Sequence, residues 1–400
     1  MICEIGLGKT FIGSEKMKDL HTGVNLVICQ KSKVKDWVKH FKQHYNNQYS
    51  IFDLTKNKVE FNGFLNSVYT SGLCPIIGII NYELAFRRTE LAKLSDFTLM
   101  LDESSLIQNE TAKRSKFILK KLSPKNVILL SGTPTSGKYE RLWSQMNLLG
   151  WNISKKMYYR QYVDMQISDD GYPIIKGYKN VDRLKRKMRE YGCVFMKSEE
   201  VLDLPQQNFI DINVDVSKEY KKFMKSGIIR FDDVELVGDT TLTKLLYARQ
   251  LCGQYSKDKL KAFKDLIDST EDRLIVFYNF NDELEKMKQL CEDRPVSIVN
   301  GSVKDLFAYE NCDNSITFIQ YQAGAKGLNL QKSNKIIYFT PTLNAEDYMQ
   351  SLKRIHRIGQ DKPCFYYRLK CGVEHHIYDV LQKRENFTND LFVEVEKCKI

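Results

Sequence analysis

The chain has 400 residues, of which 42% are apolar and 28% are charged, and its formal net charge is +11. Its mean hydropathy of -0.41 and the lack of an apolar run near the ~20 residues that cross a bilayer exclude a membrane-spanning protein and favour a soluble chain of about two or three domains. The positive charge is compatible with a polyanionic partner but does not establish one. Ten cysteines lie singly, without a C-x-x-C pair, so the sequence indicates neither a zinc site nor a disulfide framework, and a reducing cytoplasm is expected.

Short apolar runs alternate with longer segments of helical spacing in the first half of the chain. Residues 24–29 read VNLVIC, and the segment after them carries Val34, Trp37, Val38 and Phe41 at the spacing of one helical face. This alternation predicts a parallel α/β architecture, in which the ends of the strands bind the ligands. The further predicted strands in this half are residues 76–80, 97–101 and 126–130.

Gly6, Gly8, Lys9 and Thr10 belong to the stretch GLGKT, which is typical of a phosphate-binding loop. Glycines let backbone N–H groups approach phosphate oxygens, Lys9 can reach the β- and γ-phosphates, and Thr10 can bind magnesium. The generic pattern has a glycine where this chain has Cys3, so a chance match before a helix stays open as an alternative. Because only five residues precede Gly6, we expect the strand that normally leads into such a loop to be missing.

The predicted strand at 97–101 runs directly into Asp102 and Glu103. At the ligand edge of a sheet, Asp102 could hold magnesium, and Glu103 could orient and deprotonate an attacking water. The alternative is a helix cap, since Asp and Ser both favour that position.

The predicted strand at 126–130 runs into Ser131, Gly132 and Thr133. Their hydroxyl groups could relay the state of the γ-phosphate to a second lobe. An ordinary tight turn is the alternative, and this stretch by itself does not decide between the two.

The pattern changes at residues 151–195, which are basic and tyrosine-rich and include VDRLKRKMREYG. We interpret this segment as a helical insertion, followed by a linker at 201–215 that contains Pro205. The chain is therefore expected to hold two α/β lobes, residues 1–200 and 216–400. The predicted strands of the second lobe are residues 273–278, 315–320 and 335–339.

A further set of candidate site residues, which includes two arginines, lies near the end of the second lobe. Gln350, Arg354 and Arg357 lie at spacings that share one helical face or its C-terminal end. Arginine suits the stabilisation of a transferring phosphoryl group because its planar fork stays protonated, although a basic helix is more often a solvated face. Upstream, Gly324 and Gly327 lie in a glycine-rich loop that could bring backbone amides to a nucleotide or to a nucleic-acid strand.

In this order, these stretches resemble superfamily-two helicases of the Swi/Snf-type DNA translocase branch. The family usually reads DEMGLGKT where this chain reads CEIGLGKT, has histidine at Ser105, and often has asparagine at Gly137. The resemblance covers almost the whole chain and implies two RecA-like lobes, each a mostly parallel sheet flanked by helices. The stretches that carry it are CEIGLGKT, VICQKSKVKDWVKHF, DESS, SGTP with ERLW, LDLP, AGAKGLNL and QSLKRIHRIGQDKP.

The resemblance implies that ATP and Mg2+ bind the first lobe, that Glu103 activates water, and that Arg354 and Arg357 reach the nucleotide from the second lobe. It also implies a monomer that binds duplex DNA without sequence preference, with Lys31, Ser32 and Lys326 as candidate contacts. The residues that fall on nucleotide-site motifs are Gly6, Gly8, Lys9, Thr10, Asp102, Glu103, Gly324, Gly327, Gln350, Arg354 and Arg357.

We therefore expect a DNA-dependent ATPase that translocates on DNA, with or without strand separation, in a bacterial or phage-infected cytoplasm. The missing strand leads to the hypothesis that the chain is N-terminally incomplete, through a split gene, an internal start or a misplaced start codon. A catalytically impaired DNA-binding helicase fragment is accordingly the alternative. A P-loop enzyme of another kind, such as a small-molecule kinase, has no use for the RIHRIGQ segment.

Overall fold

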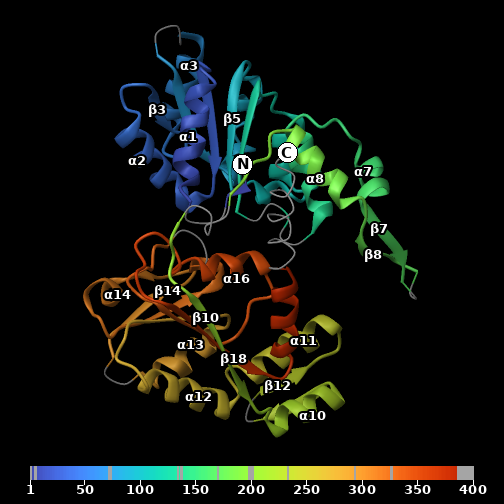
Figure 1. The fold of residues 1–400 in the computed structure, drawn as a ribbon, viewed down its shortest axis with the longest axis vertical. Helices are drawn as coiled ribbons and strands as arrows, with labels where there is room; N and C mark the ends of the chain where they lie inside the picture. The colour runs from blue at the N-terminus through green and yellow to red at the C-terminus, as the bar shows by residue number, and fades with distance from the viewer. Residues whose placement is uncertain are drawn as a thin grey trace. The chain divides into compact units, whose positions relative to one another are not determined.

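The computed structural model describes residues 2–3, 7–70, 74–132, 135, 138–168, 171–196, 202–231, 234–291, 294–324 and 328–384. The chain divides into two compact units, which meet in sequence between Val201 and Leu202 (Figure 1). No helix in the ranges just given is long and apolar enough to cross a membrane. Four predicted site residues lie outside these ranges, namely Gly6, Thr133, Lys326 and Gly327.

The first unit is built on five parallel strands: β2 (Val24–Cys29), β3 (Ser50–Asp53), β4 (Ile76–Asn81), β5 (Phe97–Asp102) and β6 (Asn126–Leu130). Their order in the sheet is β3-β4-β2-β5-β6, and every neighbouring pair is parallel. β2 and β4 are buried along their whole length, which explains why the sequence shows them as unbroken apolar runs.

Helices cover both faces of this sheet (Figure 1): α1 (Lys9–Asp19), α2 (Val34–His44), α3 (Lys58–Thr70), α4 (Tyr82–Ala85) and α5 (Lys113–Lys120). Side chains of β2 point alternately to two cores. Leu26 and Ile28 join the core that contains residues of α3 and α5, whereas Val27 and Cys29 join the core that contains residues of α1 and α2. The sheet is therefore the middle layer of three.

The predicted helical insertion at 151–195 contains an antiparallel hairpin between its two helices. The hairpin projects from the unit (Figure 1), and Gly171, with φ of 79°, lies in its reversal. The exposed fractions of Met165 and Ile167 are 44% and 71%, so the strands lack the buried face by which a hairpin is recognised in sequence. The elements are α7 (Lys155–Tyr162), β7 (Val163–Ile167), β8 (Pro173–Tyr178) and α8 (Val181–Glu190).

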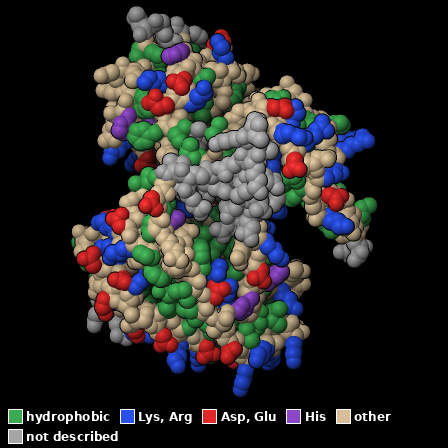
Figure 2. All heavy atoms as spheres, in the orientation of Figure 1, with side chains coloured by type: hydrophobic (Ala, Val, Ile, Leu, Met, Phe, Trp, Pro, Cys, Tyr) green, Lys and Arg blue, Asp and Glu red, His purple; other side chains and the backbone are tan. Residues whose placement is uncertain are grey.

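The two helices of this insertion share an aromatic core with α6 (Trp143–Leu148). Tyr158 and Tyr162 of α7 pack there with Leu184 of α8. Figure 2 shows lysine and arginine side chains gathered over α7 and α8. The basic side chains that are exposed on these helices are Lys156, Arg160, Arg183 and Arg186.

A two-residue strand, β1 (Ile2–Cys3), precedes the predicted phosphate loop and pairs in parallel with β9 (Phe195–Met196). The expectation that no strand precedes this loop is thus corrected. β1 escapes a sequence-based prediction because two residues carry no periodic pattern, and it pairs outside the five-stranded sheet.

The second unit is built on seven strands: β10 (Gln207–Val214), β13 (Leu274–Tyr278), β14 (Val296–Val299), β15 (Lys304–Asp305), β16 (Ile316–Gln320), β17 (Lys335–Tyr338) and β18 (Cys364–Cys371). Their order is β10-β18-β17-β13-β16-β14-β15, and only β14 with β15 is antiparallel. The predicted fold class, two α/β lobes with mostly parallel sheets flanked by helices, is confirmed.

The segment predicted as a linker at 201–215 contains strand β10, which pairs with β18 along its whole length. β10 is an edge strand, and its Asp211 carboxylate accepts hydrogen bonds from Arg368 and Lys370 of β18, both at 2.5 Å. Because polar and apolar residues are mixed in NFIDINV and Pro205 precedes it, the sequence shows no buried strand there.

The helices of the second unit are α10 (Lys218–Ser226), α11 (Thr241–Cys252), α12 (Lys257–Asp268), α13 (Asn281–Lys288), α14 (Phe307–Asn311), α15 (Tyr321–Gly324) and α16 (Ala345–Leu352). A hairpin of β11 (Ile228–Phe231) and β12 (Val234–Val237) follows α10. Side chains of β13 again alternate between two cores, with Val276 beside residues of α12 and α13 and Phe277 beside residues of α16.

A fully buried ion pair lies in the second unit, between Lys259 of α12 and Glu374, at 2.5 Å between Nζ and Oε2. The backbone amide of Cys371 also donates to Glu374 Oε2, at 3.0 Å. Burial raises the pKa of Glu374 to about 7, although the ammonium group of Lys259 acts in the opposite direction. The carboxylate therefore depends on Lys259 to stay charged.

Replacing Lys259 alone is expected to destabilise the second unit. Lys259→Met leaves a buried carboxylate without its cation, which costs about 3–5 kcal/mol. Because the pKa of Glu374 is about 7 in the wild type and rises further when its cation is removed, the loss grows as the pH rises through 7 and is small below it. Hydrogen exchange of the β17 and β18 amides at pH 8 and pH 5.5 measures it.

The double variant Lys259→Met with Glu374→Leu is the control, because it removes both charges and keeps the volume. It should lie close to the wild type at both pH values. A single variant as stable as the wild type at pH 8 would contradict the assigned role of the pair.

Candidate active site

Gly8 and Lys9 lie at the start of α1, beside the carboxyl ends of β5 and β6. Gly8 caps the helix with φ of 73°, a left-handed conformation that glycine adopts without strain. Further along α1, a Cβ at Gly13 would lie 2.7 Å from Leu130 Cδ1 and 2.9 Å from Met100 Sδ, so the helix lies close against the sheet at this glycine. Thr10 follows within the first turn of α1. These contacts fix the position of the Lys9 backbone at the start of α1.

Lys9 and Glu103 form an ion pair at 3.6 Å between Nζ and Oε1. Their side chains are only 12% and 19% exposed. Neither Lys9 Nζ nor Glu103 Oε2 makes a hydrogen bond to any residue in the described ranges, although both atoms are buried. A buried ammonium group whose N–H groups have no acceptor can donate hydrogen bonds to phosphate oxygens, so this end of α1 is suited to bind an anion.

Asp102 is the last residue of β5, and its Oδ2 accepts a hydrogen bond from the indole N–H of Trp37 at 2.9 Å. Burial and the charge of Glu103 raise the pKa of Asp102, while the bond from Trp37 and the charge of Lys9 lower it. Carboxylate oxygens are ligands that Mg2+ prefers, and those of Asp102 lie near the charge of Lys9 at the end of a strand. The residues present thus fit a magnesium–phosphate complex.

Glu103 leaves β5 in a left-handed conformation, with φ of 55° and ψ of 59°. This backbone costs a residue other than glycine about 1–3 kcal/mol and persists only where the surroundings hold it. The hydroxyl of Tyr82 donates to the backbone carbonyl of Asp102 at 2.9 Å and reaches that of Glu103 at 3.4 Å. Tyr82 is fully buried, so its ring fixes the turn that presents the Glu103 side chain.

Ser131 and Gly132 follow β6 at the same edge of the sheet, and Ser131 is buried. Lys31 and Ser32 follow β2 in a single turn of 3-10 helix (Lys31–Lys33), and both are exposed. The structure thus brings the predicted residues of the first unit that it describes to one edge of one sheet. This grouping arises because the neighbouring strands are parallel, so that their carboxyl ends meet at the same edge of the sheet.

In the second unit, Gln350 lies on α16 and is 2% exposed, and its amide donates to Oε1 of Glu346 at 3.1 Å. Because α16 ends at Leu352, Arg354 and Arg357 lie in the turn after the helix. Of the two predicted placements, the shared helical face is therefore wrong for the arginines, and the C-terminal end of the helix is right.

The two arginines differ in their surroundings. Arg354 is 5% exposed, and its Nη1 donates to the carbonyl of Leu328 at 3.0 Å while its own carbonyl accepts from the amide of Leu330 at 3.1 Å. Arg357 is half-buried, and its Nη1 donates to Oδ1 of Asn329 at 2.5 Å. Both arginines thus bind residues 328–330, which lie downstream of α15.

Four further residues of the two sites escape a sequence-based prediction. Trp37 and Tyr82 contact the Asp102–Glu103 turn from positions 65 and 20 residues away, and no spacing in the sequence indicates such contacts. Gln360 donates to the carbonyls of Gln331 and Ser333, and His356 Nε2 donates to the carbonyl of Pro205 at 2.9 Å. Both His356 and Gln360 lie in the stretch RIHRIGQ, which carries the family resemblance, and this is the signal in the sequence that could have identified them.

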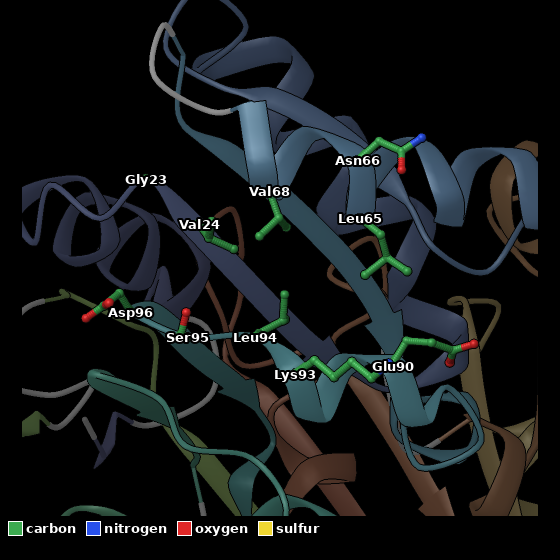
Figure 3. Close-up of a pocket in the computed structure, with 10 residues that line it drawn as sticks. All are labelled: Gly23, Val24, Leu65, Asn66, Val68, Glu90, Lys93, Leu94, Ser95 and Asp96. Atoms are coloured by element: carbon green, nitrogen blue, oxygen red, sulfur yellow. The ribbon is translucent and has the colours of Figure 1, made fainter.

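A pocket of about 550 Å3 lies at the other edge of the first sheet (Figure 3). Its wall includes Gly23 and Val24 at the start of β2 and Ser95 and Asp96 just before β5, whereas the predicted site residues follow the strands. None of the predicted site residues lines it. It therefore has no part in the site described above.

Known proteins resemble this chain over most of its length. A mouse protein, "SWI/SNF-related matrix-associated actin-dependent regulator of chromatin subfamily A member 1", is 22% identical over 92% of this chain and 38% of its own length. The "DNA repair and recombination protein RAD26" of Saccharomyces cerevisiae is 24% identical over 98% of this chain and 44% of its own length. The chain thus spans less than half the length of these relatives.

The solved "Sulfolobus solfataricus SWI2/SNF2 ATPase core in complex with dsDNA" covers 97% of this chain and 88% of its own, at 20% identity and a TM-score of 0.43. Two family models match the sequence directly. The model of the helicase conserved C-terminal domain matches residues 258–359, and that of the SNF2-related domain matches residues 1–260. Since the second match covers well over half of the chain, the protein belongs to the SNF2-related domain family.

Proposed function

We propose that the protein is a DNA-dependent ATPase that couples ATP hydrolysis to translocation on, or remodelling or unwinding of, duplex DNA. The observation that carries this proposal is the buried Lys9–Glu103 ion pair beside Asp102 at one edge of a parallel sheet. An unused ammonium group, a helix start and two carboxylates together suit the binding and hydrolysis of a nucleoside triphosphate. The membership in the SNF2-related domain family and the names of the relatives support DNA as the partner.

In this proposal, Lys9 and the backbone of α1 hold the β- and γ-phosphates of ATP, and Thr10 and Asp102 hold Mg2+. Bound Mg2+ supplies positive charge that neutralises the phosphates during transfer. Glu103 takes the proton of the attacking water. Because Lys9 is the counter-ion of Glu103, a phosphate that binds Lys9 would compete with the carboxylate and free it to act as a base.

Arg357 is the better candidate of the two arginines for contact with a transferring phosphoryl group. Its guanidinium has one described partner, the Asn329 amide, and is half-buried. Arg354 is instead enclosed by the segment around Leu328, whose carbonyl it binds. We therefore propose that Arg357 supplies charge to the reaction, and that Arg354 holds the surrounding segment in place, while Gln350 stays bound to Glu346 of its own helix.

Lys31 and Ser32 are proposed to contact DNA phosphates. Both are exposed at the carboxyl edge of the first sheet, in the segment that resembles the family's DNA-contacting stretch. Contacts of lysine and hydroxyl groups with phosphate oxygens position a duplex without reading its sequence. Such contacts make the affinity depend on salt.

Glu103→Gln is expected to abolish DNA-stimulated hydrolysis, because an amide cannot take the proton of water. The rate should fall about 100-fold or more, while the affinity for ADP with Mg2+ stays near that of the wild type. Release of inorganic phosphate and binding of a fluorescent ADP measure the two quantities.

Lys9→Ala is the contrasting variant for this test, since it should lose both nucleotide affinity and hydrolysis. Normal turnover of Glu103→Gln would remove the proposed base. If the wild type binds DNA but releases no phosphate with or without it, the protein is the impaired DNA-binding fragment considered above.

Arg357→Ala is expected to lower DNA-stimulated hydrolysis about 1000-fold, the effect of removing an arginine that stabilises transferring phosphate. ADP affinity should change little, because Lys9 and Asp102 remain. The matched variant Asn329→Ala removes the described partner of Arg357 and should lower the rate far less. Equal losses in the two variants would indicate that Arg357 only supports its loop.

Lys31→Ala is expected to weaken binding of duplex DNA and to reduce the slope of log affinity against log salt by about 1, the loss of one phosphate contact. Fluorescence anisotropy with a labelled duplex at several salt concentrations measures the slope. The control is Lys116→Ala, which removes an exposed lysine on α5. An unchanged slope in Lys31→Ala would exclude this residue from the DNA contact.

A further inference from the structure

Trp37 lies between the Asp102 carboxylate, which it contacts, and the exposed 3-10 turn Lys31–Lys33, which precedes its helix. Its indole nitrogen lies 2.9 Å from Oδ2 of Asp102, and the side chain is 3% exposed. A buried N–H that donates to a carboxylate makes a directional, charge-assisted bond. The bond occupies one carboxylate oxygen and fixes the plane of the group, so it determines where the other oxygen can meet a cation.

The position of the indole is set by packing on α2 rather than by Asp102. Trp37 stacks on Phe41 with ring centres 5.7 Å apart, and it meets the edge of His40 at 5.9 Å. It belongs to the core that contains Met17, Val27 and Ile79, from α1 and two strands. A ring held on several sides moves only when the helix that carries it moves.

The 3-10 turn that precedes the helix of Trp37 is exposed at Lys31 and Ser32. The 3-10 turn Lys31–Lys33 runs into α2 without a break, since Lys33 is the residue before the helix and Val34 is its first residue. Lys33 also pairs with Asp36 of α2 at 2.9 Å, next to Trp37. Lys31 and Ser32 are therefore joined to Trp37 by a continuous stretch of helical backbone.

We propose that Trp37 is a positioning residue that transmits contact of a duplex with Lys31 and Ser32 to the Asp102 carboxylate. This inference rests on the proposed function, because it explains how contact of DNA with the 3-10 turn would stimulate hydrolysis. In it, a phosphate backbone bound at the 3-10 turn shifts the start of α2, and the indole N–H turns the carboxylate into the orientation that the cation needs.

The first test uses the wild-type protein with 5-fluorotryptophan in place of its three tryptophans. The 19F resonance of Trp37 is assigned by elimination, from spectra of Trp143→Phe and Trp151→Phe. Addition of duplex DNA without nucleotide should shift the Trp37 resonance and leave that of Trp151 in place. A Trp37 resonance that does not move while anisotropy shows the duplex bound would overturn the proposal.

The second test is Trp37→Phe, which keeps an aromatic ring in the core and removes the N–H. Stimulation of phosphate release by duplex DNA should fall about tenfold, the weight of one hydrogen bond to a charged group. Binding of Mn2+ in the presence of ADP, followed by electron paramagnetic resonance, should weaken as well. Trp151→Phe makes the same chemical change at another buried tryptophan and should leave both quantities unchanged.

A double-variant cycle with Lys31→Ala separates transmission from a merely structural effect. If Trp37 carries the signal from Lys31, the variant with both changes should be stimulated by saturating DNA no less than Trp37→Phe alone. Losses that multiply would mean independent effects and would refute the connection.

The failure of this inference can be told from the failure of the proposed function. A wild type that hydrolyses ATP no faster with DNA contradicts the proposed function itself. A wild type that is stimulated by DNA, together with a Trp37→Phe variant that is stimulated equally, refutes only the role of Trp37.

Discussion

The first unit depends on one electrostatic constraint, the approach of the Lys9 ammonium group to the Glu103 carboxylate. The approach requires α1 to lie close against β5 and β6, which Gly13 permits because any Cβ there would meet Leu130 at 2.7 Å. Lys9 Nζ and Glu103 Oε2 are buried and without hydrogen bonds to the part of the chain that the structure describes, so each group needs a charged partner. In the proposed function, a phosphate that binds Lys9 would change the partner of Glu103, and this would link nucleotide binding to the activation of water.

The strained turn at Glu103 shows how the fold holds this arrangement. A left-handed glutamate costs about 1–3 kcal/mol, and it persists because Tyr82 donates to the backbone carbonyl of the neighbouring Asp102 and Trp37 donates to the Asp102 side chain. Both donors are buried on elements that follow other strands of the sheet. The turn is therefore fixed from two directions, as the proposed role of Glu103 as a base requires.

Much of the fold and part of the site could be predicted from the sequence, and the difference has a physical cause. Strands such as 24–29 and 76–80 are buried on both faces and appear as apolar runs, and the motif residues at their ends share an edge because the strands are parallel. The exposed hairpin of β7 and β8, the edge strand β10 and the two-residue β1 lack such a signal. Trp37 was recognisable as a core residue of its helix, but the partner of its N–H depends on tertiary packing.

The two arginines show that residue type alone does not predict the surroundings of a side chain. Arg354 and Arg357 are three residues apart and would share a face if α16 continued, but the helix ends at Leu352. Beyond that end, the backbone carbonyl of Arg354 binds the Leu330 amide, which directs the first guanidinium inward to the Leu328 carbonyl and leaves the second beside Asn329. A buried guanidinium already bound to backbone cannot also follow a moving phosphate, whereas one bound to a side-chain amide can exchange that partner for a stronger anion. The position of the helix end therefore decides which of the two arginines can act in the proposed reaction.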